Sequence, residues 1–427
     1  MNDFESSFSQ TRELALRSLT QSNGLIFPRY SGESILNILP TVARFFDMDG
    51  FQHTPIDKDL LSPIDKKPKN IILILMDALA YHRLEAWLAR SEALGWHTLK
   101  ENGLLLPLTS ICPSTTSAAI TSYWTDSEAA VHGIMGYEMW LKEYGITANM
   151  IEHKPIAYRS GSGGLSLAGF DPDTFLPVDS IAGKFMDQGV EIHAFQHFAI
   201  INSGLSQMFM GQAERHAIGT PADMWIAIRE LLESNTSTRN YIWAYWGQLD
   251  GTSHLYGPDS ERAEAEFFSF SKAFDDHFLG KLNPAVKEDT LVILTADHGQ
   301  IATDPGDNRY DLNNHPRFTE MLHMKPTGEN RLAYLHVKPG MIKSVKEYIQ
   351  NAWPGGFAVF DTGTALEEGL FGTGSPHPDI HNRLGDLVAA AKRDHYWWWG
   401  AKPNPLIGRH GGLSSQEMLV PFLAGYL

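Results

Sequence analysis

Short, continuously apolar runs recur along the chain and alternate with segments of helical periodicity. Four of these runs predict strands that are buried on both faces of a parallel sheet. They are Ile71–Met76, Glu191–Phe195, Tyr241–Trp246 and Leu291–Thr295. Amphipathic helical patterns lie between them, notably over Ala222–Leu232 and Ser260–Phe278. Because this alternation is typical of βαβ units, the chain is predicted to be an α/β protein whose mostly parallel sheet is sandwiched by helices.

The region of residues 303–371 breaks this alternation. It is rich in proline, glycine and asparagine, and it then offers a strand, a helix and a second strand. These three elements are expected at Leu332–Val337, Ile342–Asn351 and Phe357–Phe360. We interpret the region as a small α+β subdomain or lid that is inserted into a single domain spanning residues 1–427.

Acidic residues and histidines gather where the predicted strands end. Asp77, Asp250 and Asp297 each follow a buried strand, where a lone carboxylate is costly unless it is hydrogen-bonded or coordinates a metal. Three histidines accompany them in the segments LDGTSH, TADHGQ and GRHGG, namely His254, His298 and His410. This mixed nitrogen and oxygen ligand set suits Zn²⁺ or Mn²⁺ better than Mg²⁺ or Ca²⁺.

Each of these six residues also has a simpler interpretation. A strand-end aspartate is often a helix N-cap, and an isolated histidine is commonly exposed or hydrogen-bonded within a core. The carboxyl ends of parallel strands, however, meet at one edge of a sheet, so all six side chains would be delivered to the same place. Their joint placement favours a metal centre.

The segment SICPSTTSAAITSYWTDS supplies candidate nucleophiles. Ser114, Thr115 and Thr116 lead into a run of small residues that is predicted to be helical. A hydroxyl at a helix N-terminus faces unpaired backbone N–H groups and the positive end of the helix dipole, which favours an anionic phosphoryl group. The alternative is that these hydroxyls only cap the helix.

Composition restricts the partners that the protein can have. The chain of 427 residues carries 34 Lys+Arg against 50 Asp+Glu, which gives a formal net charge of -16. Binding to nucleic acid polymers or to anionic membranes depends on basic residues, so neither is expected. An anionic small-molecule substrate would need a local positive centre, and bound divalent cations would supply one.

The sequence also bears on cellular location. No apolar run approaches the roughly 18–20 residues that are needed to cross a bilayer. Residues 1–19 contain acidic side chains and lack the apolar stretch of a secretory signal. The single cysteine, Cys112, excludes an intramolecular disulfide and fits a reducing compartment. We therefore expect a cytoplasmic protein with no membrane span.

Taken together, these motifs resemble those of the type I phosphodiesterase/nucleotide pyrophosphatase family of the alkaline phosphatase superfamily. The matching segments are LILMDAL, PSTTSAA, AVHGIMGY, YWGQLDGTSHLYGPDSE, TADHGQ and GRHGG, and they extend over almost the whole chain. The resemblance implies an alkaline-phosphatase-like α/β core. It also implies hydrolysis of phosphodiester or pyrophosphate bonds in small, nucleotide-type phosphate esters.

The resemblance further implies a two-zinc site, in which Mn²⁺ could replace Zn²⁺. One ion would be held by Asp250, His254 and His410. The other would be held by Asp77, Asp297, His298 and the hydroxyl of the nucleophile. Thr116 stands at the position of the family's nucleophile, with Thr115 as the alternative, and a covalent phosphothreonine intermediate would follow.

Departures from the family's motifs leave substrate choice open. Tyr137, in HGIMGY, stands where nucleotide pyrophosphatases usually carry an Asn that contacts a non-bridging oxygen. Its phenol could donate a similar hydrogen bond, or it could simply pack. A phosphomonoesterase or a phosphonate hydrolase on the same metal core is the alternative within enzymes. A catalytically silent, metal-stabilised binding protein is the alternative of another class.

Two further features carry less weight. Cys112-Pro113 lacks the proline spacing and the arginine of the sulfatase signature, so a sulfatase is not expected. The aromatic run Tyr396–Trp399 could stack against a nucleobase, although packing of a loop or a subunit contact is the favoured interpretation.

Overall fold

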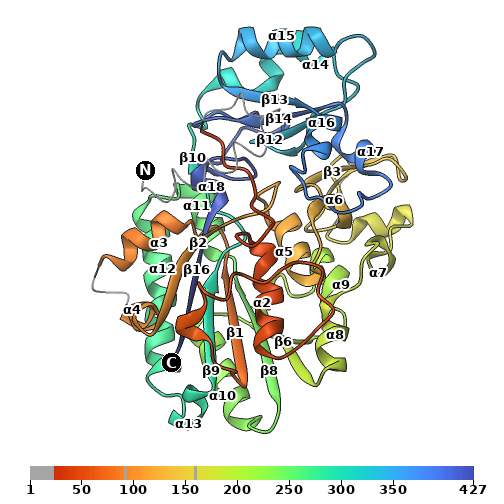
Figure 1. Ribbon diagram of the computed structural model, residues 1–427. Coiled ribbons are helices and arrows are strands. Elements are labelled where there is room, and N and C mark those ends of the chain that lie inside the picture. Colours follow the sequence, from red (N-terminus) through yellow and green to blue (C-terminus); the bar gives the residue numbers. More distant parts are fainter. Residues whose placement is uncertain (1–23, 91–93, 158–160) are drawn as a thin grey trace.

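A seven-stranded sheet forms the centre of the larger lobe in the computed structural model, which describes residues 24–90, 94–157 and 161–427 (Figure 1). Its strand order is β2-β16-β9-β1-β8-β6-β7. The strands are β1 (Asn70–Met76), β2 (Gly103–Thr109), β6 (Val190–His197), β7 (Glu214–Ile218), β8 (Arg239–Trp246), β9 (Thr290–Thr295) and β16 (Leu419–Tyr426). Strands β9, β1, β8, β6 and β7 are parallel, whereas β16 is antiparallel to both β2 and β9. The predicted α/β class is confirmed.

Strand β8 illustrates why the predicted strands are apolar at every position. On one face, Tyr241 stacks on Phe185 of α8 (Ile181–Asp187). On the other face, the ring of Trp246 lies 5.6 Å from that of Phe270 in α12 (Glu261–Phe274). Because alternate residues of a strand point to opposite faces, a strand covered by helices on both sides needs apolar residues throughout.

A second, smaller lobe contains an antiparallel sheet with the order β13-β14-β12-β11-β3-β4-β5 (Figure 1). Its strands are β3 (Glu138–Leu141), β4 (Ile146–Asn149), β5 (Lys154–Pro155), β11 (Thr327–Glu329), β12 (Leu332–Leu335), β13 (Phe357–Asp361) and β14 (Leu387–Ala391). Helix α15 (Ile342–Ala352) lies between β12 and β13 in the chain, so the strand, helix and strand expected within residues 303–371 are present.

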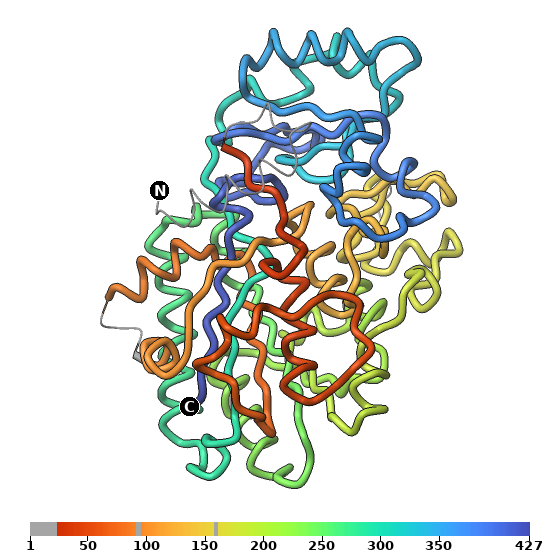
Figure 2. Tube along the Cα trace, in the orientation of Figure 1, coloured from red at the N-terminus to blue at the C-terminus, as the bar shows by residue number. Residues whose placement is uncertain are grey.

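The second sheet extends beyond residues 303–371. Strands β3, β4 and β5 come from before that segment and β14 comes from after it. Figure 2 shows these distant parts of the chain side by side, and β11 pairs with β3 through Gly328 and Glu138. The sheet of the smaller lobe is therefore assembled from two separate parts of the chain, residues 138–155 and 327–391.

The aromatic run Tyr396–Trp399 contributes to the core of the smaller lobe. Tyr396, Trp397 and Trp399 are buried in its hydrophobic cluster. Trp397 stacks on Phe357 of β13, with 4.1 Å between the ring centroids. These residues therefore pack the lobe, in line with the favoured interpretation.

No helix in the described parts of the chain is both long enough and apolar enough to span a bilayer. Cys112 is buried with a free thiol. Residues 1–19, whose composition argued against a secretory signal, lie outside the described residues. The cytoplasmic location stays a prediction.

Helix α5 (Thr116–Thr125) is held at its C-terminal end by a buried ion-pair cluster. Asp126, the residue that follows the helix, lies 3.0 Å from Nδ1 of His53, and Glu128 lies 3.4 Å from Nε2 of the same ring. Burial alone would lower the pKa of His53, but the hydrogen bonds and charges of Asp126 and Glu128 outweigh it and raise this pKa to about 9. The cluster therefore fastens residues 52–53 to the helix that begins at Thr116.

We expect His53→Gln to lower the free energy of unfolding by on the order of 2–3 kcal/mol at pH 6. A folded-state pKa raised from 6.5 to about 9 gives a contribution that is complete below pH 6.5 and is lost as the pH rises through about 9. Urea denaturation across this pH range should show the difference from wild type shrinking. His381→Gln, at an exposed histidine, should leave stability unchanged at every pH, and a pH-independent loss in His53→Gln would contradict the assignment.

Candidate active site

The predicted ligands meet beyond the carboxyl ends of β1, β8 and β9. Asp77 follows β1, and Asp297 and His298 follow β9. Asp250 lies in the first turn of α11 (Gln248–Tyr256), directly after β8, and His254 lies one turn further along the same helix. In a parallel sheet this edge is where ligands bind.

The six residues form two groups, each with one ligand atom per residue and all atoms within 4.8 Å of one another. The first group is Asp77, Asp297 and His298, all of which are buried. The second group is Asp250, His254 and His410, which are partly accessible. The rings of His298 and His410 stack with centroids 3.8 Å apart, so the two groups adjoin. The structure thus brings together the same two ligand sets that the family resemblance implies.

A short ladder delivers His410 to this edge. Strand β15 (Gly408–Arg409) pairs antiparallel with β10 (Ile301–Ala302), which follows closely after His298. Gly408 is needed for this approach, because a Cβ atom there would overlap the carbonyl oxygen of Ser253 and the side chain of Gln300. The ladder therefore places the GRHGG segment against the TADHGQ segment.

All three histidines are oriented by backbone carbonyl oxygens. Nδ1 of His254 lies 2.8 Å from Gly408 O, Nδ1 of His298 lies 3.1 Å from Gly299 O, and Nδ1 of His410 lies 3.3 Å from Ser114 O. Each Nε2 atom consequently faces the carboxylates, as in the contacts of 3.3 Å to Asp250 and 3.4 Å to Asp77. A carbonyl partner at Nδ1 places the proton there and leaves Nε2 free to ligate a metal.

The first group fits a bound cation because it contains buried carboxylate oxygens that no hydrogen bond from the described residues compensates. Asp77 Oδ1 and Asp297 Oδ2 are buried and have no hydrogen-bond partner. Burial, and then the charges of Asp297 and Asp250, raise the pKa of Asp77 well above its usual value. Burial, followed by the neighbouring His298 and His254, lowers the pKa of His410 well below its usual value. A divalent cation would remove the repulsion between the carboxylates. The neutral imidazole of His410 would be available as a ligand in the adjoining second group.

Thr115 and Thr116 have different surroundings. Thr116 is the first residue of α5, and its Oγ1 lies 3.1 Å from His298 Nε2 and 3.5 Å from Asp77 Oδ2. Thr115 Oγ1 instead donates a 2.7 Å hydrogen bond to Glu329 in β11. The hydroxyl that lies among the candidate metal ligands is therefore that of Thr116.

Three residues of the site were not anticipated from the sequence. The hydroxyl of Tyr245, in β8, donates to Asp77 Oδ2, and Nε2 of Gln300 donates to Asp250 Oδ1. Glu329 is buried beside Thr115, and burial raises its pKa to about 8. Gln300 stands within the TADHGQ segment and Tyr245 in a predicted strand, so both were close to recognised motifs. Glu329 lies in the smaller lobe, and the sequence around it does not mark it as a residue of the site.

Tyr137 and Thr115 are hydrogen-bonded to the same carboxylate, that of Glu329. Its backbone N–H donates a 2.7 Å hydrogen bond to Glu329 Oε1, and its hydroxyl accepts a 2.7 Å hydrogen bond from Asn149. The side chain is 40% exposed. A contact between its phenol and a substrate oxygen stays a prediction.

Residues 71–413 match the family model of type I phosphodiesterase / nucleotide pyrophosphatase. The chain belongs to this family. The resemblance inferred from the motifs is thereby confirmed, and the protein is a hydrolase of the phosphodiesterase/nucleotide pyrophosphatase type, in a metal-dependent family of the alkaline phosphatase superfamily. A search of curated protein sequences gives no significant match.

Solved structures of this superfamily share the fold. Murine ectonucleotide pyrophosphatase/phosphodiesterase 5 is 15% identical, with a TM-score of 0.61 over 82% of this chain and 87% of its own. An inactive threonine-to-alanine variant of that protein, in complex with AMP, is 14% identical with a TM-score of 0.60 over the same shares. Phosphonoacetate hydrolase from Sinorhizobium meliloti 1021, in complex with phosphonoacetate, is 17% identical, with a TM-score of 0.61 over 84% of this chain and 90% of its own.

We expect Asp250→Ala to bind one metal equivalent fewer than the wild type, because Asp250 belongs to the second ligand group. Elemental analysis after loading with Zn²⁺ and gel filtration would measure this loss. Asp276→Ala removes a surface carboxylate that pairs with Lys272, away from both ligand groups, and it should retain the full metal content. Equal metal contents in Asp250→Ala and the wild type would refute the assignment of this group.

Proposed function

We propose that this hydrolase cleaves phosphodiester or pyrophosphate bonds of small, nucleotide-type molecules with Thr116 as its nucleophile. The observation that supports this most directly is the position of the Thr116 hydroxyl. It lies at the N-terminus of α5, within 3.5 Å of Asp77 and 3.1 Å of His298. A nucleophile placed beside metal-ligating groups at a helix N-terminus suits attack on an anionic phosphoryl group.

We infer that two divalent cations, Zn²⁺ or Mn²⁺, serve this reaction. Asp77, Asp297 and His298, with the Thr116 hydroxyl, would hold one, and Asp250, His254 and His410 would hold the other. The mixed imidazole and carboxylate donors support these ions over Mg²⁺ or Ca²⁺. When bound, such a pair activates the attacking oxygen, stabilises the departing oxygen and neutralises charge on the phosphoryl group.

Residues of the chain supply the nucleophile and position the metal ligands. Thr116 Oγ1 loses its proton and forms a bond to phosphorus while the bond from phosphorus to the leaving oxygen breaks. The leaving oxygen takes up a proton from solvent, and a phosphothreonine results. Water then attacks phosphorus, the bond to Oγ1 breaks, and the threonine hydroxyl is restored. Tyr245 and Gln300 act as positioning residues, since each donates a hydrogen bond to an aspartate of one ligand group.

The relatives support a threonine-dependent reaction on a nucleotide-type ligand. The murine relative is inactive as a threonine-to-alanine variant, and that variant binds AMP. The Sinorhizobium relative, which is as similar in structure, is a phosphonoacetate hydrolase. Hydrolysis of a phosphonate is therefore the second candidate, because it would use the same metal core with a different surrounding pocket.

We expect Thr116→Ala to lower kcat by at least about a thousandfold, because it removes the nucleophile while leaving the aspartates and histidines in place. The assay would use a nitrophenyl phosphodiester of a nucleoside, nitrophenyl phosphate and phosphonoacetate, each with added Zn²⁺ or Mn²⁺. Thr115→Ala is the matched control, since its hydroxyl bonds to Glu329 instead, and it should retain most of the activity.

The three substrates separate the candidate functions. Preference for the diester supports the proposal, whereas preference for phosphonoacetate or the monoester favours the second candidate or a phosphatase. A Thr116→Ala enzyme that keeps its activity would refute Thr116 as nucleophile. A metal-loaded wild type that cleaves none of the three would contradict the proposed substrate class and favour a narrower substrate or a binding role.

A further inference from the structure

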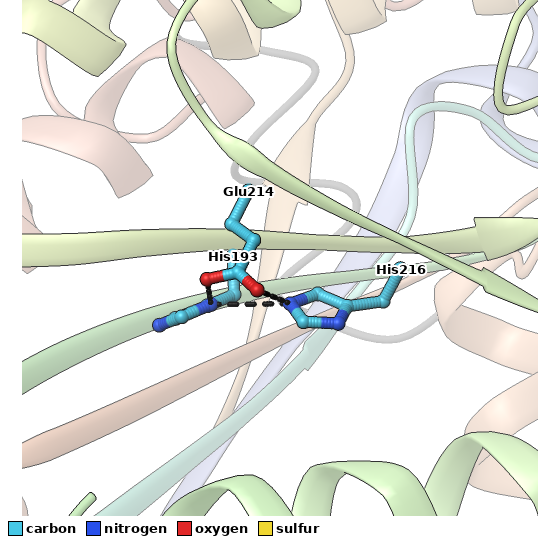
Figure 3. A group of neighbouring side chains, drawn as sticks. All are labelled: His193, Glu214 and His216. Carbon is cyan, nitrogen blue, oxygen red and sulfur yellow. Dashed lines mark hydrogen bonds and ion pairs between the residues drawn. The ribbon is translucent and has the colours of Figure 1, made fainter.

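A third group of side chains that could hold a metal ion lies on the main sheet (Figure 3). His193 comes from β6, and Glu214 and His216 come from the neighbouring strand β7. One ligand atom from each lies within 4.8 Å of the others. The active-site groups stand beyond the ends of the central strands β1, β8 and β9, whereas this group lies along β6 and β7, the last two strands at one edge of the sheet.

Strand register explains why these side chains meet. In the parallel pair of β6 and β7, His193 is opposite Glu214 and Phe195 is opposite His216. Because alternate residues share a face, all four side chains project from one side of the sheet, and so does Glu191. The spacing of one residue between Glu214 and His216 is therefore what allows both to reach His193.

The separations among the three ligands resemble those around a tetrahedral ion. His193 Nδ1 lies 3.1 Å from His216 Nε2 and 3.4 Å from Glu214 Oε2, and His216 Nε2 lies 3.8 Å from Glu214 Oε1. Bonds of about 2.0–2.1 Å in tetrahedral geometry would separate ligand atoms by roughly 3.3–3.4 Å. Figure 3 shows the two ring nitrogens and the carboxylate turned toward a common point.

A second carboxylate lies on the far side of the His193 ring. Glu191 Oε2 is 3.6 Å from His193 Nε2, and it also accepts a hydrogen bond from Asn235. His193 Nε2 is buried without a hydrogen-bond partner, so Glu191 is the carboxylate placed to accept its proton when Nδ1 ligates an ion. An arrangement of carboxylate, histidine and metal is the usual way in which a ligating imidazole is oriented.

Packing also fixes the direction of the His216 ring. The ring of His216 stacks on Phe195 with centroids 4.3 Å apart and an interplanar angle of 10°, which fixes its direction.

We propose that His193, Glu214 and His216 bind a divalent transition-metal ion, Zn²⁺ in particular, which fastens the edge strand β7 to β6. Two imidazoles and one carboxylate suit Zn²⁺ and disfavour Mg²⁺ and Ca²⁺, which prefer oxygen ligands. The side chain of Glu214 is 66% exposed, so water has access to a fourth position. The ion would secure a strand of the described sheet that pairs on one side only.

Equilibrium dialysis of the full-length protein against Zn²⁺ tests this site. Glu214→Gln and His216→Asn should each bind one equivalent fewer than the wild type, and Zn²⁺ should raise their Tm by less. Glu191→Gln should retain the equivalent with an affinity lowered by about 10–100-fold. Arg215→Gln is the matched control, because Arg215 lies between the two ligands on β7 and projects from the opposite face; it should match the wild type.

The outcome is independent of the proposed hydrolysis. Circular dichroism would confirm that the variants are folded, and their hydrolytic activity should equal that of the wild type, since none of these residues belongs to the active site. Equal Zn²⁺ stoichiometry in His216→Asn and the wild type would overturn the proposal. So would displacement of the third equivalent by Mg²⁺ as readily as by Mn²⁺ or Co²⁺.

Discussion

Buried negative charge at the ends of β1 and β9 is the constraint on which the rest of this structure depends. Asp77 and Asp297 are almost fully buried, and each has an oxygen without a hydrogen-bond partner. Such groups are costly in a protein interior unless a positive charge compensates them. The three histidines whose Nε2 atoms face the aspartates, and the Thr116 hydroxyl at the start of α5, are arranged around this charge. A metal centre accounts for all of these features together.

Segments that are far apart in the sequence hold these side chains in position. The ladder of β10 and β15 brings His410 to His298, and carbonyl oxygens from that ladder and from Ser114 orient the rings. His53 and Asp126 fasten the far end of α5. The smaller lobe reaches the site through Glu329, which bonds to both Thr115 and Tyr137. The candidate metal ligands thus lie outside the smaller lobe, which contributes Glu329 beside Thr115.

The proposed site on β6 and β7 follows the same chemistry with a different supporting structure. In the active site, strand ends and loops deliver the ligands, and backbone carbonyls orient the histidines. On the edge of the sheet, the strand register delivers the ligands, and a carboxylate and an aromatic ring orient the histidines. An edge strand has a partner on one side only, so an additional link to β6 has a clear physical role.

The sequence by itself determined the α/β class, the four parallel strands and the segments that carry the active-site ligands. Runs such as Tyr241–Trp246 are apolar throughout because both faces of the strand are covered, and a strand end followed by Asp77 or Asp297 has a local signal. Only the tertiary structure showed that the Thr116 hydroxyl lies beside Asp77 and His298 while that of Thr115 bonds to Glu329. It revealed Glu329 and Tyr245, and it gave the smaller lobe strands from outside residues 303–371. It also brought His193 to Glu214 and His216. These features depend on contacts between residues far apart in the chain, and hydrophobic periodicity records only which face of an element is buried, not which partner covers it.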